Sequence, residues 1–503
     1  MDKGRVWLVG AGPGAGGLIT IKGKDVLSQA DVVIYDALIG PEILNYVNFD
    51  TKLIYAGKLK GKHHMKQEQI NDLILEEAQK GNKVVRLKGG DPYVFGRGAE
   101  ELELLLENDI PYEVIPGVTS AFAVPTFFGI PVTHRDHSSE IHIVSGHRKT
   151  DTIKLDYQRL AQGEGTLILL MGLTLISDIT KGLMEAGMSP DIPVAVLIRG
   201  TRADGRRVIG TLSTIEKKDN EIEVDHHALI VIGDVCNLSE HIDNKKNNRL
   251  SKISVIVAGS EKSCKRLSGL LKEEGVESIE LPVISIEPLC NSTTLAGYSK
   301  KILDKKYEWI VFTSGEGVSN FFREFMKISD ARGLFGTKLA VIGPGTASVL
   351  SAYGLKADFI AEKSYGKNLG EELSKICNSG DRLLILRAEK GNEELVEALE
   401  KNKDLTITDV GIYRVNQRTE RINDLSKIYD IERADYVMFT SASSVKSLSD
   451  YLLKEGYDTT KIKAICIGDK TAKEAEKYNF MIWKSEIASL PSMVDCLKKI
   501  VNE

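Results

Sequence analysis

The chain has 503 residues, of which 42% are hydrophobic and 27% charged, and its formal net charge is −5. This length predicts two to four domains, and the composition is that of an ordinary globular protein. The net charge gives no reason to expect nucleic acid or a membrane surface as a partner. No apolar run approaches the ~18 residues that cross a bilayer, and the N-terminus lacks a secretory signal pattern. We therefore expect a cytoplasmic protein.

Six cysteines are widely spaced along the sequence: Cys236, Cys264, Cys290, Cys377, Cys466 and Cys496. None belongs to a C-x-x-C pair, which argues against a zinc or iron–sulfur site, and we expect no bound metal. They are instead expected to be small buried side chains in a reducing compartment.

Apolar, β-branched runs alternate with amphipathic runs, which is the pattern of βαβ units and predicts an α/β fold. In the first half these runs are RVWLVGA, DVVIYD, KVVRLKGG, IHIVSG, TLILLMG, VAVLI and ALIVIGD. The segment HIDNKKNNRLSK is polar and aperiodic, which is typical of a linker. The predicted domains are therefore residues 1–242 and 253–503, joined by a linker at 243–252.

The first predicted strand ends in VGAGPGAGG, which contains a G-x-G-x-x-G pattern over Gly12–Gly17. With Asp31 and Asp36 downstream, this spacing resembles a dinucleotide-binding loop. However, Pro13 removes an N–H from the loop that would hold a pyrophosphate. An NAD site is therefore the weaker alternative for this half of the chain.

A later strand leads into VVRLKGGDPYVFGRGAEE, from Val84 to Glu101, and this is the most informative motif. Two glycines and an Asp-Pro end the apolar run, so the backbone at Gly89 and Gly90 can approach a ligand closely. Ligands of open α/β sheets bind at the carboxyl ends of strands. The motif therefore predicts a ligand site at this strand end, and IPGVTSAFAVP and MGLTLISD end apolar runs in a similar way.

The second half of the chain repeats itself. YEWIVFTSGEGVSNFF, beginning at Tyr307, matches DYVMFTSASSVKSLSD, beginning at Asp435, and KLAVIGPGTASVLSAYGL matches KAICIGDKTAKEAEKYNF. The repeat is too long for a solenoid unit. It predicts two similar α/β lobes with a ligand cleft between them.

Residues 1–242 resemble uroporphyrinogen-III C-methyltransferase, of the tetrapyrrole methylase family. The resemblance includes VGAGPG, ADVVIYD, AGK, VVRLKGGDPYVFGRGAEE, IPGVTSAFAVP, TLILLMG, RGTRADGRRVIGTL and ALIVIGDV, and the GGDP-FGRG and RGT-ADGRR blocks are specific to this enzyme. It implies two α/β lobes with S-adenosylmethionine between them. The methyl acceptor would be a pyrrole carbon of a reduced tetrapyrrole, and a homodimer through this half is a further expectation.

The resemblance assigns roles to residues at strand ends. The implied methyl-donor site comprises Pro13, Gly89, Gly90, Asp91, Val94, Thr119, Ser120, Met171 and Gly200. Asp36 and Lys58 are the implied acid/base groups, while Arg97 and Glu100 would lie near the macrocycle. The cations available for the substrate carboxylates are Lys58, Lys60, Lys62, His63, His64, Arg135, His137, Arg199 and Arg202.

Each role has a structural alternative. Asp36 suits a strand-end turn, Met171 a core gap, and Arg97 a solvated helix start. The lysine-rich loop KLKGKHH is also compatible with an ordinary solvated segment. One segment departs from the family: where GPG is usually followed by Asp-Pro, this chain has Ala15, Gly16 and Gly17, so one loop or substrate contact is in doubt.

Residues 253–503 resemble uroporphyrinogen-III synthase, through FTS after a strand in both repeats, IG followed by TA at a helix start, LILRAEKGNEEL and VGIYRV. The resemblance implies one lobe of residues 253–288 plus 417–503 and another of residues 289–416. Gly259 and Ser260 replace the usual Thr-Arg, which puts one anion contact in doubt.

In this half, Tyr413 is the implied general acid. The implied tetrapyrrole-binding hydroxyls at the cleft are those of Ser314, Thr346, Ser441 and Thr471, where helix N–H groups also bind carboxylates. The structural alternatives are helix N-caps for the hydroxyl residues and a packed strand aromatic for Tyr413.

The two resemblances together predict a bifunctional enzyme. Its second half would cyclise hydroxymethylbilane to uroporphyrinogen III, and its first half would methylate that product twice with S-adenosylmethionine to give precorrin-2, toward cobalamin or sirohaem. The alternative is an active methyltransferase with a non-catalytic tetrapyrrole-binding or sensor module at its C-terminus.

Overall fold

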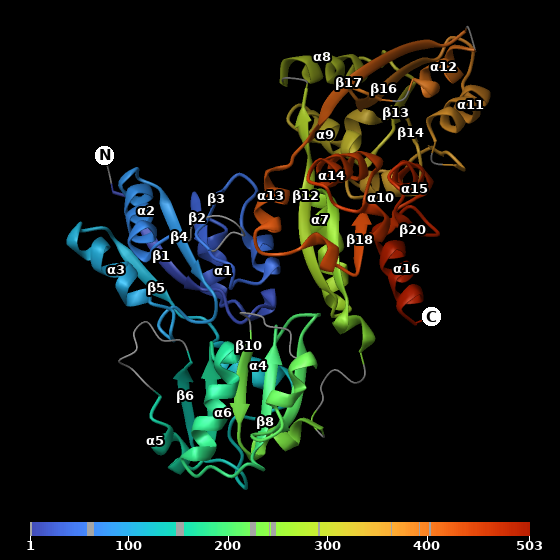
Figure 1. The fold of residues 1–503 in the computed structure, drawn as a ribbon. Helices are drawn as coiled ribbons and strands as arrows, with labels where there is room; N and C mark the ends of the chain where they lie inside the picture. Colours follow the sequence, from blue (N-terminus) through green and yellow to red (C-terminus); the bar gives the residue numbers. More distant parts are fainter. Residues whose placement is uncertain are drawn as a thin grey trace.

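The computed structural model describes residues 3–57, 65–146, 155–221, 228–240, 242, 248–289, 292–363, 365–391, 393–401 and 404–502. These residues form three sheets, two of five strands and one of ten (Figure 1). In the part of the chain so described, no helix is long and apolar enough to span a bilayer.

The N-terminal lobe is a five-stranded parallel sheet in the order β3-β2-β4-β1-β5. Its strands are β1 (Arg5–Gly10), β2 (Val32–Tyr35), β3 (Lys52–Tyr55), β4 (Lys83–Lys88) and β5 (Tyr112–Ile115), and its helices are α1 (Ile21–Leu27), α2 (Gln67–Gln79) and α3 (Gly98–Glu107). Both faces of the sheet are covered, which explains the continuous apolar runs. All carboxyl ends lie along one edge, where the predicted ligand loops begin.

The middle lobe is a mixed sheet in the order β6-β7-β10-β8-β9, in which β10 is antiparallel to both neighbours. Its strands are β6 (Ile141–Ser145), β7 (Thr166–Leu170), β8 (Pro193–Ile198), β9 (Arg206–Thr211) and β10 (Ala228–Ile232), and its helices are α4 (Ser120–Phe127), α5 (Tyr157–Gln162) and α6 (Ile176–Glu185). Helix α4 follows β5 of the N-terminal lobe but packs Ala121 and Val124 into the core of the middle lobe. It therefore fixes the two lobes to each other.

The C-terminal unit is one continuous sheet in the order β15-β14-β13-β16-β17-β12-β11-β18-β19-β20. Its strands are β11 (Ser254–Ser260), β12 (Glu277–Pro288), β13 (Trp309–Phe312), β14 (Lys338–Val341), β15 (Phe359–Ile360), β16 (Arg382–Ala388), β17 (Thr406–Gln417), β18 (Tyr436–Phe439), β19 (Lys463–Cys466) and β20 (Met481–Lys484). Only the β12–β17 pair is antiparallel, over Ile284–Pro288 and Tyr413–Gln417. These two long strands join a near lobe (β11, β12 and β18 to β20) to a far lobe (β13 to β17).

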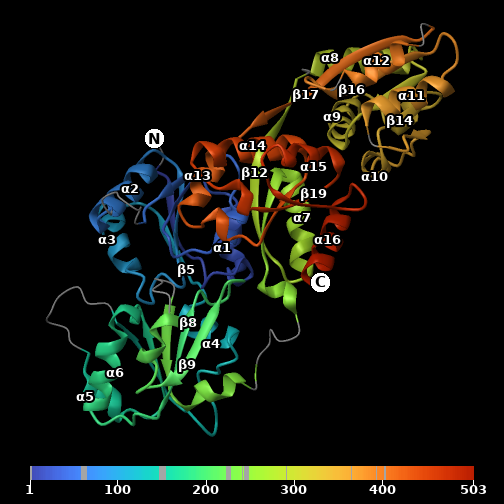
Figure 2. The same cartoon turned by 45° about the vertical axis from the view of Figure 1, so that its right-hand side comes forward.

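Ten helices are described for the C-terminal unit, and they cover both faces of its sheet (Figure 2). They are α7 (Glu261–Glu273), α8 (Ser292–Leu303), α9 (Gly315–Phe325), α10 (Pro344–Ser351), α11 (Gly366–Ile376), α12 (Glu394–Glu400), α13 (Glu420–Ser426), α14 (Ala442–Lys454), α15 (Asp469–Glu476) and α16 (Leu490–Asn502). The sequence repeat corresponds to β13–α9 and β14–α10 in the far lobe and to β18–α14 and β19–α15 in the near lobe.

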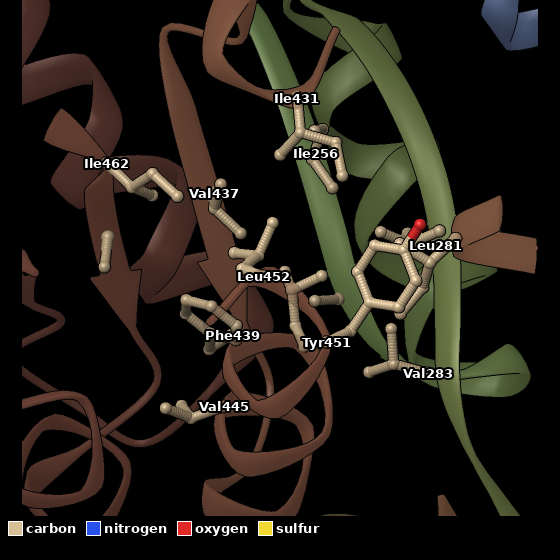
Figure 3. Close-up of a cluster of buried hydrophobic side chains, with 14 of the residues drawn as sticks. Ile256, Leu281, Val283, Ile431, Val437, Phe439, Val445, Tyr451, Leu452 and Ile462 are labelled. Atoms are coloured by element: carbon tan, nitrogen blue, oxygen red, sulfur yellow. The ribbon is translucent and has the colours of Figure 1, made fainter. Parts of the chain in front are cut away.

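The near lobe has a core between its sheet and α14, in which Phe439, Val445 and Leu452 pack against Ile256 and Val283 (Figure 3). Its strand β12 also contacts the N-terminal lobe, through the 3₁₀ segment η2 (Pro41–Tyr46). Ile428 of the near lobe packs against the core of the N-terminal lobe. The near lobe is therefore the part of the C-terminal unit that is joined to the first half.

Candidate active sites

The loops after β1 and β4 are joined by backbone hydrogen bonds. The amide of Gly12 donates to Gly90 O at 3.2 Å, and the amide of Gly90 donates to Gly12 O at 2.8 Å. Gly90 has a φ of +66°, a conformation that favours glycine. These bonds hold the GPG loop and the GGDP loop side by side, directly beyond two neighbouring strand ends.

Asp91 ties a third loop to this corner. Its carboxylate accepts from the amide of Gly117 at 3.0 Å and from the amide of Tyr93 at 2.8 Å. A Cβ at Gly117 would lie 2.2 Å from Gly90 O, so the two backbones are in close contact. The predicted donor-site residues Gly89, Gly90 and Asp91 are therefore packed against the loop that leads to α4.

Thr119 and Ser120 begin α4 beside this corner. Thr119 is the helix N-cap, and a Cβ at Gly90 would lie 3.7 Å from the amide of Ser120. Gly200 packs on the same helix, since a Cβ there would lie 2.2 Å from Val124 Cγ1. Thus the structure brings most of the predicted donor-site residues together at the start of α4.

The remaining predicted donor-site residues lie in loops at the rim. Pro13 directly follows Gly12. The amide of Val94 donates to Asp91 O, and the Val94 side chain is partly exposed. Met171 follows β7 in a left-handed conformation and is 42% exposed, so it is not a core residue. The alternative that Met171 fills a gap in the core is therefore wrong.

Exposed apolar side chains gather in the loops at these strand ends. Seven large ones are at least 36% exposed. They follow β2, β4, β5 and β7 or lie at the start of α4: Leu38, Tyr93, Val94, Phe95, Val118, Phe122 and Met171. Apolar surface left exposed in loops around a polar corner is typical of a ligand site.

Asp36 lies at the end of β2 and is part of an ion-pair network that sequence patterns did not reveal. Its carboxylate accepts from Arg86 at 3.0 Å, and Glu101 accepts from both Arg86, at 3.2 Å, and Lys88, at 2.7 Å. Arg86, Lys88 and Glu101 are all buried. The only sign of this network in the sequence is the presence of two cations, Arg86 and Lys88, inside the apolar strand KVVRLK.

Burial changes the acid/base properties of this network. Desolvation lowers the pKa of the Lys88 ammonium, the nearby Arg86 charge lowers it further, and Glu101 opposes both effects. Charged side chains of this kind persist in an interior only when they are paired. Asp36 also accepts from the amide of Leu38 at 3.0 Å, so it is a strand-end turn residue, as the structural alternative predicted, and its second oxygen is held by Arg86.

Arg97 and Glu100 form a pair with each other at the start of α3. The Arg97 guanidinium donates to both oxygens of Glu100, at 2.8 and 2.5 Å, and both side chains are partly exposed. Lys58 and the neighbouring Lys60, Lys62, His63 and His64 lie outside the described residues. Their predicted roles are therefore untested by the structure.

Two of the cations expected to meet substrate carboxylates are largely buried. Arg199 donates to Asp204 at 3.1 Å, and Arg202 lies beneath the near lobe, with its guanidinium 5.4 Å from the ring of Tyr429. Both are only 7% exposed. Arg135 and His137, by contrast, are exposed.

The G-x-G-x-x-G pattern does not form a dinucleotide-binding turn. The amide of Gly12 is bonded to Gly90, residues Gly16–Leu18 form a 3₁₀ turn, and α1 begins only at Ile21 with Thr20 as its N-cap. A pyrophosphate loop needs free amides at a helix N-terminus. This geometry disfavours the NAD alternative.

In the C-terminal unit, Tyr413 and Ser314 meet between β17 and the start of α9. Their hydroxyls are 2.8 Å apart, and Ser314 also accepts from the amide of Gly317. Burial raises the pKa of the Tyr413 phenol, although the hydrogen bond to Ser314 opposes the shift. The phenol is therefore protonated at neutral pH, as a general acid must be.

The other predicted hydroxyls occupy matching positions in the two lobes. Ser441 caps α14 as Ser314 caps α9, so both confirm the N-cap interpretation. Thr346 and Thr471 are instead buried in the first turns of α10 and α15. A Cβ at Gly345 or at Gly468 would lie 3.4 or 3.5 Å from Ala488, so these two helix starts approach the same residue.

A cavity of ≈ 530 Å³ lies between the near lobe, the far lobe and the N-terminal lobe. Its wall contains the start of α7, residues of β12, Glu316 of α9, and Phe49 and Asp50 of the N-terminal lobe. Its lining contains four cationic residues, Lys262, Lys265, Arg266 and Arg418, and three acidic ones, Asp50, Glu261 and Glu316. Lys265 pairs with Glu261 and Arg418 pairs with Asp50. The volume is in the range of small-molecule sites.

None of the described residues form a group of three or more His, Cys, Asp or Glu side chains suited to a metal ion. The described cysteines are free: Cys236, Cys264 and Cys466 are buried, and Cys377 and Cys496 are partly buried. Burial raises the pKa of the Cys236 thiol to about 12, which makes it unreactive.

Comparisons with known proteins identify both halves. The family model described as Tetrapyrrole (Corrin/Porphyrin) Methylases matches residues 5–216, and the model described as Uroporphyrinogen-III synthase HemD matches residues 265–495. The chain is 39% identical over 506 residues to "Porphyrin biosynthesis protein HemD" of Ruminiclostridium josui, with 99% of each covered.

Two further relatives match the first half. One is the "S-adenosyl-L-methionine-dependent uroporphyrinogen III methyltransferase" of Methanosarcina barkeri, 44% identical over 49% of this chain and 97% of that protein. The other is the crystal structure of "Uroporphyrin-III C-methyl transferase" of Thermus thermophilus complexed with S-adenyl homocysteine. It is 38% identical, covers 47% of this chain and 100% of that chain, and has a TM-score of 0.41.

Proposed function

Because the chain belongs to the family of porphyrin biosynthesis proteins that join a tetrapyrrole methylase to a uroporphyrinogen-III synthase, we propose that it makes precorrin-2 from hydroxymethylbilane. It is an enzyme with two activities, a uroporphyrinogen-III C-methyltransferase and a uroporphyrinogen-III synthase. The proposed domains are residues 1–242 and 253–503, joined at 243–252. The synthase forms uroporphyrinogen III, and the methyltransferase adds two methyl groups to it.

The methyl donor is proposed to be S-adenosylmethionine, bound at the corner formed by Gly90, Asp91 and Thr119. The observation that carries this proposal is the set of hydrogen bonds that gathers three strand-end loops at the start of α4. Backbone groups at Gly89 and Gly90 can meet the amino-acid part of the donor, since no Cβ stands in the way. Met171 offers an exposed apolar side chain to the adenine.

The acceptor is proposed to lie over the exposed apolar loops, with a pyrrole carbon in line with the sulfonium methyl. Positioning supplies most of the rate in such a transfer. The carbon must also lose a proton, and Asp36, held by Arg86 at the end of β2, and Lys58 are the proposed acid/base groups. Arg97 and Glu100 are proposed to contact the macrocycle.

In the synthase, Tyr413 is proposed to protonate the leaving hydroxyl of hydroxymethylbilane. Its phenol is held by Ser314 and keeps its proton at neutral pH. The helix starts that carry Ser314, Thr346, Ser441 and Thr471 are proposed to bind substrate carboxylates through their amides. Lys262 and Arg266 of α7 are proposed to supply positive charge to substrate carboxylates at the cavity.

Calorimetry with S-adenosylhomocysteine and NAD tests the methyltransferase half. Binding of S-adenosylhomocysteine with no binding of NAD is expected, and binding of NAD alone would contradict the proposal. The synthase half is tested by the isomer formed from hydroxymethylbilane. Formation of uroporphyrinogen I alone would support a non-catalytic C-terminal module. We further propose a cytoplasmic homodimer formed through the methyltransferase half, which sedimentation of the pure protein tests.

A further inference from the structure

The amide of Gly16 ties the GPG loop to a carboxylate of the same lobe. The amide of Gly16 donates to Glu42 Oε2 at 2.9 Å. A Cβ at Gly16 would lie 3.0 Å from Glu42 Cβ, so a side chain at this position would displace Glu42.

The other oxygen of Glu42 bonds to the synthase domain. It accepts from the amide of Ser278, on β12, at 3.0 Å. Strand β12 pairs with β17 only from Ile284 onward, so its first residues form a sheet edge. The segment η2 covers this edge, because Asn45 also bonds to Ser278 O at 2.8 Å and to the amide of Glu280 at 2.9 Å.

The preceding residue of β12 holds the loop after β8. Glu277 Oε2 accepts from the amide of Ala203 at 2.6 Å, and the Glu277 side chain is 9% exposed. The same loop returns to the GPG loop, because the amide of Ala15 donates to Thr201 Oγ1 at 3.0 Å. A closed ring of contacts thus joins β12, Glu42, the Ala15–Gly16 loop and the Thr201–Ala203 loop.

We propose that the synthase domain positions the two methyl-transfer loops through Glu42 and Glu277, so that methyl transfer depends on the docked edge of β12. This proposal rests on the proposed function, because it assumes that the methyl donor binds beside Gly12 and Gly200, where the two loops begin. Glu42 and Glu277 are positioning residues, because they touch loop backbone and no reacting atom.

Three of the four bonds in the ring are made to the carboxyl groups of Glu42 and Glu277, and the fourth to the hydroxyl of Thr201. A bond to a carboxylate is stronger than one between neutral groups. Two consecutive residues of one strand hold both loops at a fixed spacing. Small displacements of groups that orient a substrate reduce methyl-transfer rates steeply. Loss of one contact is therefore expected to lower kcat/KM for methyl transfer roughly tenfold, the equivalent of one charge-assisted hydrogen bond.

Three variants of the full-length protein test the proposal. Glu42→Gln can satisfy only one of the two amides, and Ser278→Pro removes the N–H on β12 from which Glu42 accepts. Asn45→Ala is the matched control, since it removes two bonds to the same strand without touching either loop. Should Ser278→Pro fail to fold, Glu277→Ala takes its place, because it removes the acceptor for Ala203.

Methyl transfer to supplied uroporphyrinogen III, cyclisation, and hydrogen exchange at Gly16 are measured for each variant. Glu42→Gln and Ser278→Pro should each lower methyl-transfer kcat/KM roughly tenfold and speed exchange at Gly16 by a similar factor, with cyclisation unchanged. The double variant Glu42→Gln/Ser278→Pro should lose no more methyl-transfer activity than either single variant, because both substitutions break the same connection. Asn45→Ala should leave methyl transfer within about twofold of wild type, since it touches neither loop.

Unchanged exchange and methyl transfer in Ser278→Pro would overturn the proposal, as would an equal loss in Asn45→Ala. The exchange measurement also separates this inference from the proposed function. If the variants exchange faster at Gly16 but the wild-type protein transfers no methyl group, the ring of contacts is supported and the proposed methyltransferase activity is refuted.

Discussion

At the scale of single residues, Asp91 shows how one side chain organises a site. Its two oxygens accept from Gly117 and Tyr93, so the loops after β4 and β5 share one acceptor. The sequence motif GGDP indicated the position of Asp91 but not these partners, because Gly117 lies on a different strand-end loop. The pairs of Asp36 with Arg86 and of Tyr413 with Ser314 were equally invisible in the sequence.

Asp91→Ala should abolish S-adenosylhomocysteine binding. The substitution leaves two loop amides without their acceptor and frees the backbone that surrounds the donor, so an affinity loss of roughly 100-fold or more is expected from two charge-assisted bonds. Calorimetry on the folded variant measures it, and Glu103→Ala, on α3, serves as a control. An unchanged affinity would remove Asp91 from the site.

Tyr413→Phe should lower the cyclisation rate by roughly 100-fold, within the range that general acid catalysis contributes. Ser314→Ala should have a smaller effect, since it removes only the partner that orients the phenol. Rates and product isomers are measured from hydroxymethylbilane, and methyl transfer to supplied uroporphyrinogen III is the internal control. Wild-type cyclisation by Tyr413→Phe would exclude the phenol as the acid.

At the scale of elements, the apolar runs of the sequence correctly predicted strands at Arg5–Gly10, Val32–Tyr35 and Lys83–Lys88. The repeat likewise predicted two similar α/β lobes. What no local pattern predicted is that β12 and β17 pair to make one ten-stranded sheet, or that η2 covers the edge of β12. Such pairings depend on contacts between residues far apart in the chain, which periodicity does not encode.

Ser441→Ala should destabilise the near lobe by about 1 kcal/mol, because Ser441 caps α14 in a reciprocal capping box with Ser444. The cap interpretation predicts this loss in stability whether or not the hydroxyl also binds substrate. Urea unfolding measures it, with Ser443→Ala, an exposed position in the first turn of the same helix, as the control. A loss of cyclisation with no change in stability would instead favour a direct substrate contact.

At the scale of the whole molecule, the two catalytic domains share a buried polar interface. Phe49 stacks on Arg418, with its ring 4.2 Å from the guanidinium, and Tyr35 donates to Asp424 O at 3.2 Å. Since Phe49 and Asp50 also line the cavity between the near and far lobes, the first half of the chain forms part of its wall.

The interface should weaken as pH rises. Burial raises the pKa of Glu277 to about 7, with Arg202 opposing the shift and Glu42 and Asp204 adding to it. Since the folded pKa exceeds the unfolded value, stability is full below about pH 4.5 and is lost as pH rises through about 7, by on the order of 3 kcal/mol. Glu277→Gln should reduce the slope of this part of the stability profile, while Glu280, whose pKa burial also raises to about 7, maintains the remainder. Thermal unfolding between pH 5 and 8 measures it, and parallel profiles for the two proteins would contradict the assignment.

The most direct test of the proposed function supplies the pure full-length protein with hydroxymethylbilane and S-adenosylmethionine and identifies the product by mass and absorbance. The account predicts precorrin-2, carrying two added methyl groups, and predicts uroporphyrinogen III when the methyl donor is left out. Accumulation of uroporphyrinogen I with no methylated product would contradict it.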